Sequence, residues 1–389
     1  MNDIDRILRQ ATESGTVPGI VAMAADADGV VYQGAFGRRA LPAGPPMTAD
    51  TVFRIASMTK AITATAAMQL VEQGRLSLDA PAGDVLPELA SPQVLEGFDA
   101  AGSPLLRPAR RSITLRHLLT HTAGFGYDIW NADLLRYHRE TGMPAARTGR
   151  LSGLSSPLTF DPGTRWQYGI NIDWAGRMVE AVSGDDLETH FHRHIFAPLD
   201  MVDTSYLVRP TMESRLAIVH ARTSEGLQPL QLESDPPREF YPGGGGLFST
   251  ATDYLVFLRT LLAGGTYRGN AILRPETVAS MFQNHLGELL VEPMQSAVPA
   301  SSNHIELFPG VPKKWGLSFL INTQSVPGRR SANSLAWAGL NNTYYWIDPI
   351  LGVTGLLMTQ VLPFGDPDVL NALDQFEGEI YRQHQNPHQ

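Results

Sequence analysis

The sequence predicts an α/β protein of the α+β type, in which an antiparallel sheet flanked by helices is joined to an all-α unit. Apolar stretches flank Asp28-Gly29, a dipeptide that suits a tight β-hairpin because both positions tolerate positive φ. Near the other end of the chain β-favouring segments follow one another, whereas residues 79–240 show helical patterns joined by proline-containing loops. One sheet made from both ends of the chain, with a helical insertion, is the simplest assembly of these parts.

Periodic apolar residues define the elements of the expected sheet layer. Residues 4–11 and 369–380 repeat apolar side chains at helical spacing, which predicts two amphipathic helices that cover the sheet. The turn Asp348 to Gly352 joins the last two strands. The segments expected as strands are 20–25, 30–36, 315–322, 334–340, 343–347 and 353–361.

The helix expected over residues 61–71 is apolar on nearly every side, which is typical of a buried central helix, and Gly74 is its candidate C-cap. Further helices are expected over 115–120, 172–182 and 250–262, the last with Thr250 or Ser249 as N-cap. We therefore predict two domains with the active site in the cleft between them. Residues 1–60 and 245–389 would form the sheet domain, and residues 61–244 the mainly helical domain.

Composition narrows the class of protein. Hydrophobic residues make up 43% of the 389 residues, charged residues 18%, and the formal net charge is −9. This balance is ordinary for a globular protein and argues against partners such as nucleic acid or a membrane surface. The chain has no cysteine, which excludes disulfides and thiolate-bound metals. No apolar run has the length of a signal peptide or a membrane span, so we expect a cytoplasmic protein, or a periplasmic one whose leader was removed.

Ser57 and Lys60 are the residues that point to chemistry. They stand three apart at the start of the central helix, so they share one face and lie within hydrogen-bond reach. A serine hydroxyl needs a neighbour to accept its proton, and a lysine in an apolar site has a lowered pKa that suits it to this task. The backbone N–H of Ser57 at the helix N-terminus also faces a developing oxyanion.

Around this pair the sequence resembles class C β-lactamases, DD-peptidases and their esterase relatives, the family VIII carboxylesterases, whose common feature is an S-x-x-K nucleophile motif. Five matching segments follow in the same order and cover most of the chain. They are FRIASMTK at 53–60, HLLTHTAG at 117–124, FDPG and WQY at 160–168, PLDM at 198–201 and GGGLFS at 244–249. The resemblance implies the β-lactamase/transpeptidase-like fold of penicillin-binding proteins.

The resemblance also implies roles for individual residues. Tyr168 would relay protons as general base, with a pKa lowered by the neighbouring lysine. The oxyanion hole would pair the backbone N–H groups of Ser57 and Leu340, and Gly339 would let the strand approach the substrate. The substrate-binding residues expected from the strand motif and from aromatic side chains near the other motifs are Trp337, Ala338, Gly339, Phe125, Tyr127 and Trp166, with Trp130 as a further candidate for the acyl pocket.

Two departures from the family pattern concern specificity. The Y-x-N motif reads Tyr168-Gly169-Ile170, with Asn171 one place late, so the amide that would bind a substrate amide is absent or displaced. The K-T-G or H-x-G strand motif reads Trp337-Ala338-Gly339, and tryptophan cannot replace a cation that binds a carboxylate. Both departures favour an uncharged acyl substrate, and W-x-G resembles the esterase branch.

We therefore predict a serine carboxylesterase that hydrolyses uncharged, short-chain esters through an acyl-enzyme on Ser57, with a small-molecule ester as partner and no cofactor. The alternatives on the same scaffold are a β-lactamase, a DD-peptidase or amidase, and an acyltransferase that uses an alcohol in place of water. A penicillin-binding sensor that acylates and stalls, and a catalytically inactive relative, are alternatives of a different class. The sequence leaves acyl length, stereopreference and oligomeric state open.

Three other signals carry little weight. His117 and His121 are four apart, but the glutamate of H-E-x-x-H is missing, so no metal site is predicted. The glycine run at 243–246 lacks the lysine of a phosphate-binding loop and is expected to allow close backbone approach beside the active site. No G-x-S-x-G segment is present, which disfavours an α/β-hydrolase triad.

Overall fold

Strands from both ends of the chain meet in one antiparallel sheet. The computed structural model describes residues 3–231 and 238–385. The strands of this sheet are β1 (Gly19–Ala25), β2 (Val30–Gly37), β11 (Lys313–Trp315), β12 (Leu320–Asn322), β13 (Leu335–Gly339), β14 (Thr343–Asp348) and β15 (Val353–Met358). Within the described residues they are arranged in the order β11-β12-β13-β14-β15-β1-β2, so the N-terminal hairpin extends the C-terminal meander.

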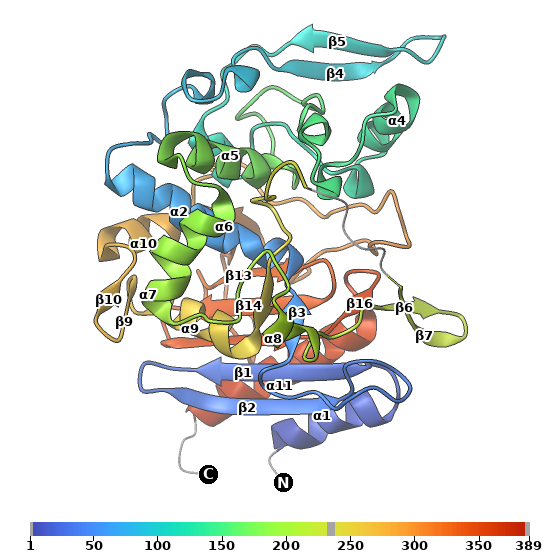
Figure 1. The fold of residues 1–389 in the computed structure, drawn as a ribbon, viewed down its shortest axis with the longest axis vertical. Helices are drawn as coiled ribbons and strands as arrows, with labels where there is room; N and C mark the ends of the chain where they lie inside the picture. The colour runs from blue at the N-terminus through green and yellow to red at the C-terminus, as the bar shows by residue number, and fades with distance from the viewer. Residues whose placement is uncertain (1–2, 232–237, 386–389) are drawn as a thin grey trace.

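Helices cover both faces of this sheet. α1 (Asp3–Glu13) and α11 (Pro367–Gln385) pack together on one face, and α9 (Ala251–Leu262) packs on the other (Figure 1). Successive side chains of β14 point to opposite faces of the sheet. The ring of Tyr345 contacts that of Tyr254 on α9, and the ring of the next residue, Trp346, contacts that of Phe376 on α11. Both faces of the central strands β13, β14, β15 and β1 are therefore buried, which explains why these strands are largely apolar, whereas most of the edge strand β2 is exposed or half-buried.

A buried ion pair attaches α11 to the sheet. The guanidinium group of Arg330, just before β13, donates from Nε and Nη2 to the two carboxylate oxygens of Glu377, at 2.8 and 2.6 Å. Both side chains are buried. A bidentate pair of this kind neutralises both buried charges and also holds α11 in one position against the sheet.

The remaining helices form a second layer that extends away from the chain termini (Figure 1). These helices are α2 (Thr59–Glu72), α3 (Leu115–Leu119), α4 (Ala132–Thr141), α5 (Asn171–Ser183), α6 (Leu187–Phe191), α7 (Ala197–Leu199), α8 (Pro210–Glu213) and α10 (Pro275–Met281). The small strand pairs are β3 (Val52–Arg54) with β8 (Phe248–Thr250), β4 (Gln93–Phe98) with β5 (Pro104–Pro108), and β9 (Thr266–Tyr267) with β10 (Asn270–Ala271). α2 is buried from Thr59 to Leu70 and packs against α5, as its all-round apolar sequence predicts.

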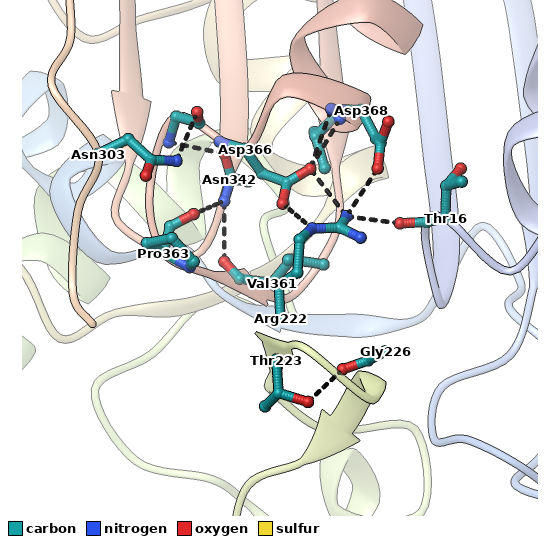
Figure 2. Close-up of polar contacts among 12 residues, drawn as sticks. Thr16, Arg222, Thr223, Gly226, Asn303, Asn342, Val361, Pro363, Asp366 and Asp368 are labelled. Atoms are coloured by element: carbon teal, nitrogen blue, oxygen red, sulfur yellow. Dashed lines mark hydrogen bonds and ion pairs between the residues drawn. The ribbon is translucent and has the colours of Figure 1, made fainter. Parts of the chain in front are cut away.

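A hairpin from the middle of the chain returns to the sheet layer. β6 (His220–Thr223) pairs with β7 (Gly226–Pro229) and, in parallel, with β16 (Val361–Leu362). Figure 2 shows Arg222 of β6 bonded to the carboxylates of Asp366 and Asp368 at the start of α11 and to the carbonyl oxygen of Thr16. One guanidinium group thus ties the middle of the chain to both of its ends.

The predicted fold class is confirmed, and so are the hairpin at Asp28-Gly29, the terminal helices and the Thr250 N-cap, whose hydroxyl accepts from the Asp253 N–H at 3.1 Å. The single strand expected over 315–322 is wrong, because Gly316–Phe319 forms a turn between β11 and β12 with Ser318 at a φ of 80°. The division of the chain into two domains stays a prediction. Among the helices of the described residues, none is both long enough and apolar enough to cross a membrane.

Candidate active site

Ser57 lies at a tight turn between β3 and α2. The residue before it, Ala56, has a φ of 44°, in the left-handed region that residues with a Cβ rarely adopt. A 3₁₀ turn, η1 (Ala56–Met58), then leads directly into α2. Backbone strain of this kind collects at functional sites, and here it precedes the predicted nucleophile.

Lys60 is fully buried one turn along from Ser57. Its Nζ donates to Ser57 Oγ at 3.0 Å, to the hydroxyl of Tyr127 at 3.1 Å and to the carbonyl oxygen of Gly244 at 2.5 Å. Burial lowers the pKa of Lys60 to about 7, although the carboxylate of Asp173 acts in the opposite direction. A large share of this lysine is therefore a free amine at neutral pH, within reach of the serine proton.

A buried carboxyl group, that of Asp173 on α5, lies behind the lysine. Its Oδ1 accepts from the Gly244 N–H at 2.9 Å, and its side chain is also hydrogen bonded to Tyr127. Burial raises the pKa of Asp173, while the charge of Lys60 opposes that rise. A Cβ at Gly244 would lie 2.6 Å from Asp173 Oδ2 and 2.9 Å from the Tyr127 hydroxyl, so the site requires glycine here. This confirms that the glycine run allows close backbone approach.

Tyr168 contacts Ser57 from the side of the helical layer. Its hydroxyl is hydrogen bonded to Ser57 and accepts from Nε1 of Trp337 at 2.9 Å. Trp337 pairs with Tyr345 in the sheet, so its side chain lies on the α9 face, toward the helical layer. The indole thus orients the tyrosine from the opposite side of the site.

The expected effect of Lys60 on Tyr168 is wrong. Burial raises the pKa of Tyr168 and outweighs the hydrogen bonds from Ser57 and Trp337, which lower it. The phenol therefore stays protonated at neutral pH. Among these side chains, Lys60 is the one whose pKa lies near the pH at which a general base works.

A cavity of about 180 Å³ opens over Ser57. Its walls come from η1, the segments 127–130 and 145–147, the glycines 244–246, and Leu340. Aromatic and small apolar groups form much of this lining, and Asp128 and Arg147 pair with each other at 3.0 Å beside it. The cavity suits a small, uncharged group attached to the serine.

The structure brings some predicted site residues to this cavity and places others elsewhere. Tyr127, Trp130 and Leu340 line it together with Ser57. Phe125 stacks on Trp174 with ring centroids 6.0 Å apart, inside the core. Two further predicted residues are also buried away from the cavity. They are Trp166, packed 5.5 Å from the ring of Trp315, and Ala338 within β13.

Gly339 allows a close backbone approach within the protein. A Cβ at this position would lie 2.3 Å from the Ile55 carbonyl oxygen and 2.3 Å from Thr343 Oγ1. Glycine thus lets β13 approach the backbone just before the nucleophile, and the approach of this strand to the substrate stays a prediction. This close approach is what carries Leu340, the next residue, to the wall of the cavity beside Ser57.

Asn171 is displaced from the site, as the shifted motif predicts. Its Nδ2 donates to the Phe125 carbonyl oxygen at 3.0 Å and lies 3.1 Å from Nδ1 of His121, so it supports the loop that carries the aromatic residues. His117 accepts from the Thr114 N–H through Nδ1 and caps α3. The two histidines of the HLLTHTAG segment thus make hydrogen bonds within the helical layer.

Sequence reasoning missed several residues of the site. Asp173 follows Tyr168 by five positions and stands in the first turn of a predicted helix, where an acidic residue is ordinary because it faces the positive end of the helix dipole, so the sequence does not mark it as a site residue. Nothing in the sequence pattern marks Asp128, Arg147 or Arg238 as pocket residues, because short 3₁₀ turns and a loop bring them to the cavity.

Comparison with known proteins identifies the family. The sequence model of the family described as Beta-lactamase matches residues 4–378. The chain belongs to this family. It is 36% identical over 98% of its length to monacolin J acid methylbutanoyltransferase from Aspergillus terreus, of which it covers 96%. It is 33% identical to lovastatin esterase from Penicillium rubens, with 98% of each chain covered.

Among solved structures, unliganded simvastatin synthase (LovD) from Aspergillus terreus superposes with a TM-score of 0.85, at 34% identity and with 98% of each chain covered. The relatives at this level of identity include acyltransferases and an esterase. The β-lactamase/transpeptidase-like fold is thereby confirmed, and the chain is an enzyme of the kind that acts on esters or acyl groups.

Proposed function

We propose that this protein is a serine acyltransferase with esterase activity: a short, uncharged acyl group is taken up on Ser57 and passed to an alcohol, with water as the competing acceptor. The observation that carries the proposal is the hydrogen bond between Lys60 Nζ and Ser57 Oγ, made by a buried lysine whose pKa is about 7. A nucleophile and a base held in contact in this way are the minimum for covalent acyl transfer.

In the first half of the reaction, Ser57 Oγ attacks the carbonyl carbon of the ester and its proton passes to Lys60 Nζ. The ammonium that forms lies near the carboxylate of Asp173, which stabilises the positive charge. The tetrahedral oxyanion is bound by the backbone N–H groups of Ser57 and Leu340, both of which line the cavity.

The leaving alkoxide then takes a proton from the hydroxyl of Tyr168, which is protonated at neutral pH, and Lys60 replaces that proton. This assigns Lys60 as the base and Tyr168 as the relay. In the second half, the acceptor hydroxyl loses its proton by the same route in reverse and attacks the acyl-enzyme, which releases the new ester, or the free acid where the acceptor is water.

The lining of the cavity and the strand motif support an uncharged acyl group. Trp337 stands where the family places a cation, and its indole N–H is committed to Tyr168. The charge of Arg147 is engaged by Asp128, and Arg238, the second arginine of the lining, also has an interaction partner within the protein. A β-lactam or a peptide with a free carboxylate would find no cation on this part of β13.

The choice of an alcohol acceptor rests on the relatives. Monacolin J acid methylbutanoyltransferase and simvastatin synthase are named for acyl transfer, and lovastatin esterase, at slightly lower identity, is named for hydrolysis. A purely hydrolytic enzyme is therefore the second candidate, and it differs only in the molecule that attacks the acyl-enzyme.

The test uses p-nitrophenyl butyrate as donor with and without a primary alcohol. Intact-protein mass spectrometry of quenched samples should show one butyryl group, located on Ser57 by peptide mapping. Added alcohol should divert product from butyrate to the butyrate ester of that alcohol. Because an acyl-enzyme accumulates only when deacylation limits turnover, the alcohol should also raise the steady-state rate of nitrophenol release.

Ser57→Ala should abolish turnover, whereas Ser155→Ala, at an exposed serine outside the cavity, should not change it. Turnover that survives in Ser57→Ala would refute the nucleophile. An acyl-enzyme that yields only butyrate at every alcohol concentration would leave esterase as the function. Efficient cleavage of a chromogenic cephalosporin would contradict the interpretation of Trp337.

A further inference from the structure

A second group of chemically capable side chains lies where α5 ends and α6 begins. Asp185 follows the glycine that ends α5, His190 lies in α6, and His194 lies in the π-helical turn η7 (His192–Phe196) that continues α6. One carboxylate oxygen and one nitrogen of each imidazole all lie within 4.8 Å of one another. The described part of the chain contains no other group of three histidine or acidic side chains placed in this way.

The imidazole of His190 is buried without hydrogen-bond partners in the part of the molecule that the structure describes. It is 3% exposed, and neither of its ring nitrogens has a hydrogen-bond partner among the described residues. Buried polar groups in native proteins are nearly always paired, so two unpaired nitrogens on one buried ring need an explanation. The ring of His194 lies 4.6 Å from that of His190 and is partly exposed, which leaves a path from solvent to the buried imidazole.

We propose that Asp185, His190 and His194 form a zinc site. Two imidazoles and one carboxylate are a ligand set that holds Zn²⁺ in tetrahedral geometry with one position left for water. The two histidines are four apart on consecutive helical turns, and the π-helical turn η7, which contains His194, is a distortion that is frequent at functional sites. Zinc would also satisfy one of the unpaired nitrogens of His190.

The protonation state of the cluster favours metal binding. Burial lowers the pKa of His190 to about 4, and burial also lowers the pKa of His194, with Arg193 adding to both effects. Both imidazoles are therefore neutral at pH 7, which is the form that binds a metal, and binding needs no loss of protons from them.

The same surroundings limit the affinity. Arg193 donates from Nη1 to Asp185 Oδ2 at 2.5 Å, so a zinc ion has to share this carboxylate with a guanidinium group. The charge of Arg75 also acts on both imidazoles and disfavours a cation. We expect a dissociation constant in the micromolar range rather than the tight binding of a structural zinc site.

The place of the cluster in the fold gives binding a consequence. α6 packs against α5, and Gln69 of α2 donates to the carbonyl oxygen of His194 at 3.0 Å. Zinc would therefore fix η7 and the end of α5 relative to each other, beside the helices that carry Lys60 and Asp173. Since zinc binds the folded chain, the thermal unfolding midpoint should rise with its concentration.

The experiment is a calorimetric titration of the chelator-treated, full-length protein with zinc chloride at pH 7. We expect one equivalent bound by the wild type. His194→Ala should bind at least ~10-fold more weakly. His192→Ala is the matched control, because His192 lies on the same turn, is exposed and is outside the cluster. The absence of cysteine removes thiolates as competing ligands.

Thermal unfolding gives an independent second measurement. Zinc should raise the midpoint of the wild type and of His192→Ala, and a chelator should reverse the rise, whereas His194→Ala and Asp185→Asn should show neither effect. Retained ester turnover would show that these variants are folded. A wild type that binds no stoichiometric zinc, or a His194→Ala variant that binds zinc as His192→Ala does, would overturn the proposal.

Discussion

Replacing Lys60 by methionine tests the electrostatics of the site without reference to any substrate. The pKa of Lys60 falls from 10.5 in the unfolded chain to about 7 in the folded one because the amine is buried. Between pH 7 and 10.5 the unfolded chain binds a proton that the folded chain lacks, so this group makes wild-type stability rise with pH. Below pH 7 both states hold the proton and its unfavourable contribution is constant.

The magnitude follows from the difference in pKa. At about 1.4 kcal/mol for each pH unit, keeping Lys60 buried costs about 4 kcal/mol at pH 7 and about 2 kcal/mol at pH 9. Lys60→Met removes this cost but leaves the carbonyl oxygen of Gly244 unpaired, which offsets ~1–3 kcal/mol of the gain. The stability advantage of the variant over wild type should therefore shrink by about 2 kcal/mol between pH 7 and pH 9.

The assay is urea unfolding followed by tryptophan fluorescence at both pH values, with ester turnover measured on the same samples. Turnover should be lost in Lys60→Met. The double variant with Asp173→Asn is the control, because it removes the buried carboxyl group whose own titration would otherwise contribute. A difference in unfolding free energy between wild type and Lys60→Met that is the same at pH 7 and pH 9 would refute a buried lysine with a depressed pKa.

Four further predictions concern the site and the sheet. The rate of acylation should fall about tenfold for each pH unit below 7, because Lys60 must lose its proton first, as stopped-flow release of nitrophenol at several pH values would measure. Gly244→Ala should abolish turnover in a folded protein, seen as an unchanged circular dichroism spectrum, because its Cβ would lie 2.6 Å from a carboxylate oxygen. Trp337→Phe removes the donor to the tyrosine hydroxyl and should lower kcat about tenfold, consistent with ~1–2 kcal/mol for one hydrogen bond, with little change in KM. Arg330→Met should lower the free energy of unfolding by ~3–5 kcal/mol because Glu377 stays buried without its partner, and replacing both residues by methionine should restore most of that loss in urea unfolding.

Local sequence patterns were enough to predict most of the fold. The Asp28-Gly29 hairpin, the apolar α2 and the Thr250 cap each depend on residues close together in the chain. The strand break was missed although Gly316 and Ser318 are both residue types that are common in turns, because Leu317 and Phe319 continue the apolar pattern of a strand across them. Ser57 and Lys60 were recognisable because one helical turn relates them.

The rest of the site depends on contacts between residues that are far apart in the sequence, which no local pattern predicts. Tyr168 was given the wrong pKa direction because its burial comes from contacts with Trp130 and Trp337, which reach it from opposite parts of the sequence. The charge of the neighbouring lysine alone predicted a lowered pKa for Tyr168. Desolvation by the surrounding rings raises this pKa and is the larger effect, and it can be recognised only in the folded structure.

Local sequence and a distant residue together explain how the lysine can serve as a base. The apolar sequence of α2 desolvates Lys60, which lowers its pKa, and Asp173, brought next to it through Gly244, limits how far the pKa falls. Without the carboxylate the amine would be neutral at a lower pH but would be a weaker base, since base strength falls with pKa. The nucleophile motif therefore identifies the residues that react, while a carboxyl group and a glycine from distant segments set the pH at which they do so.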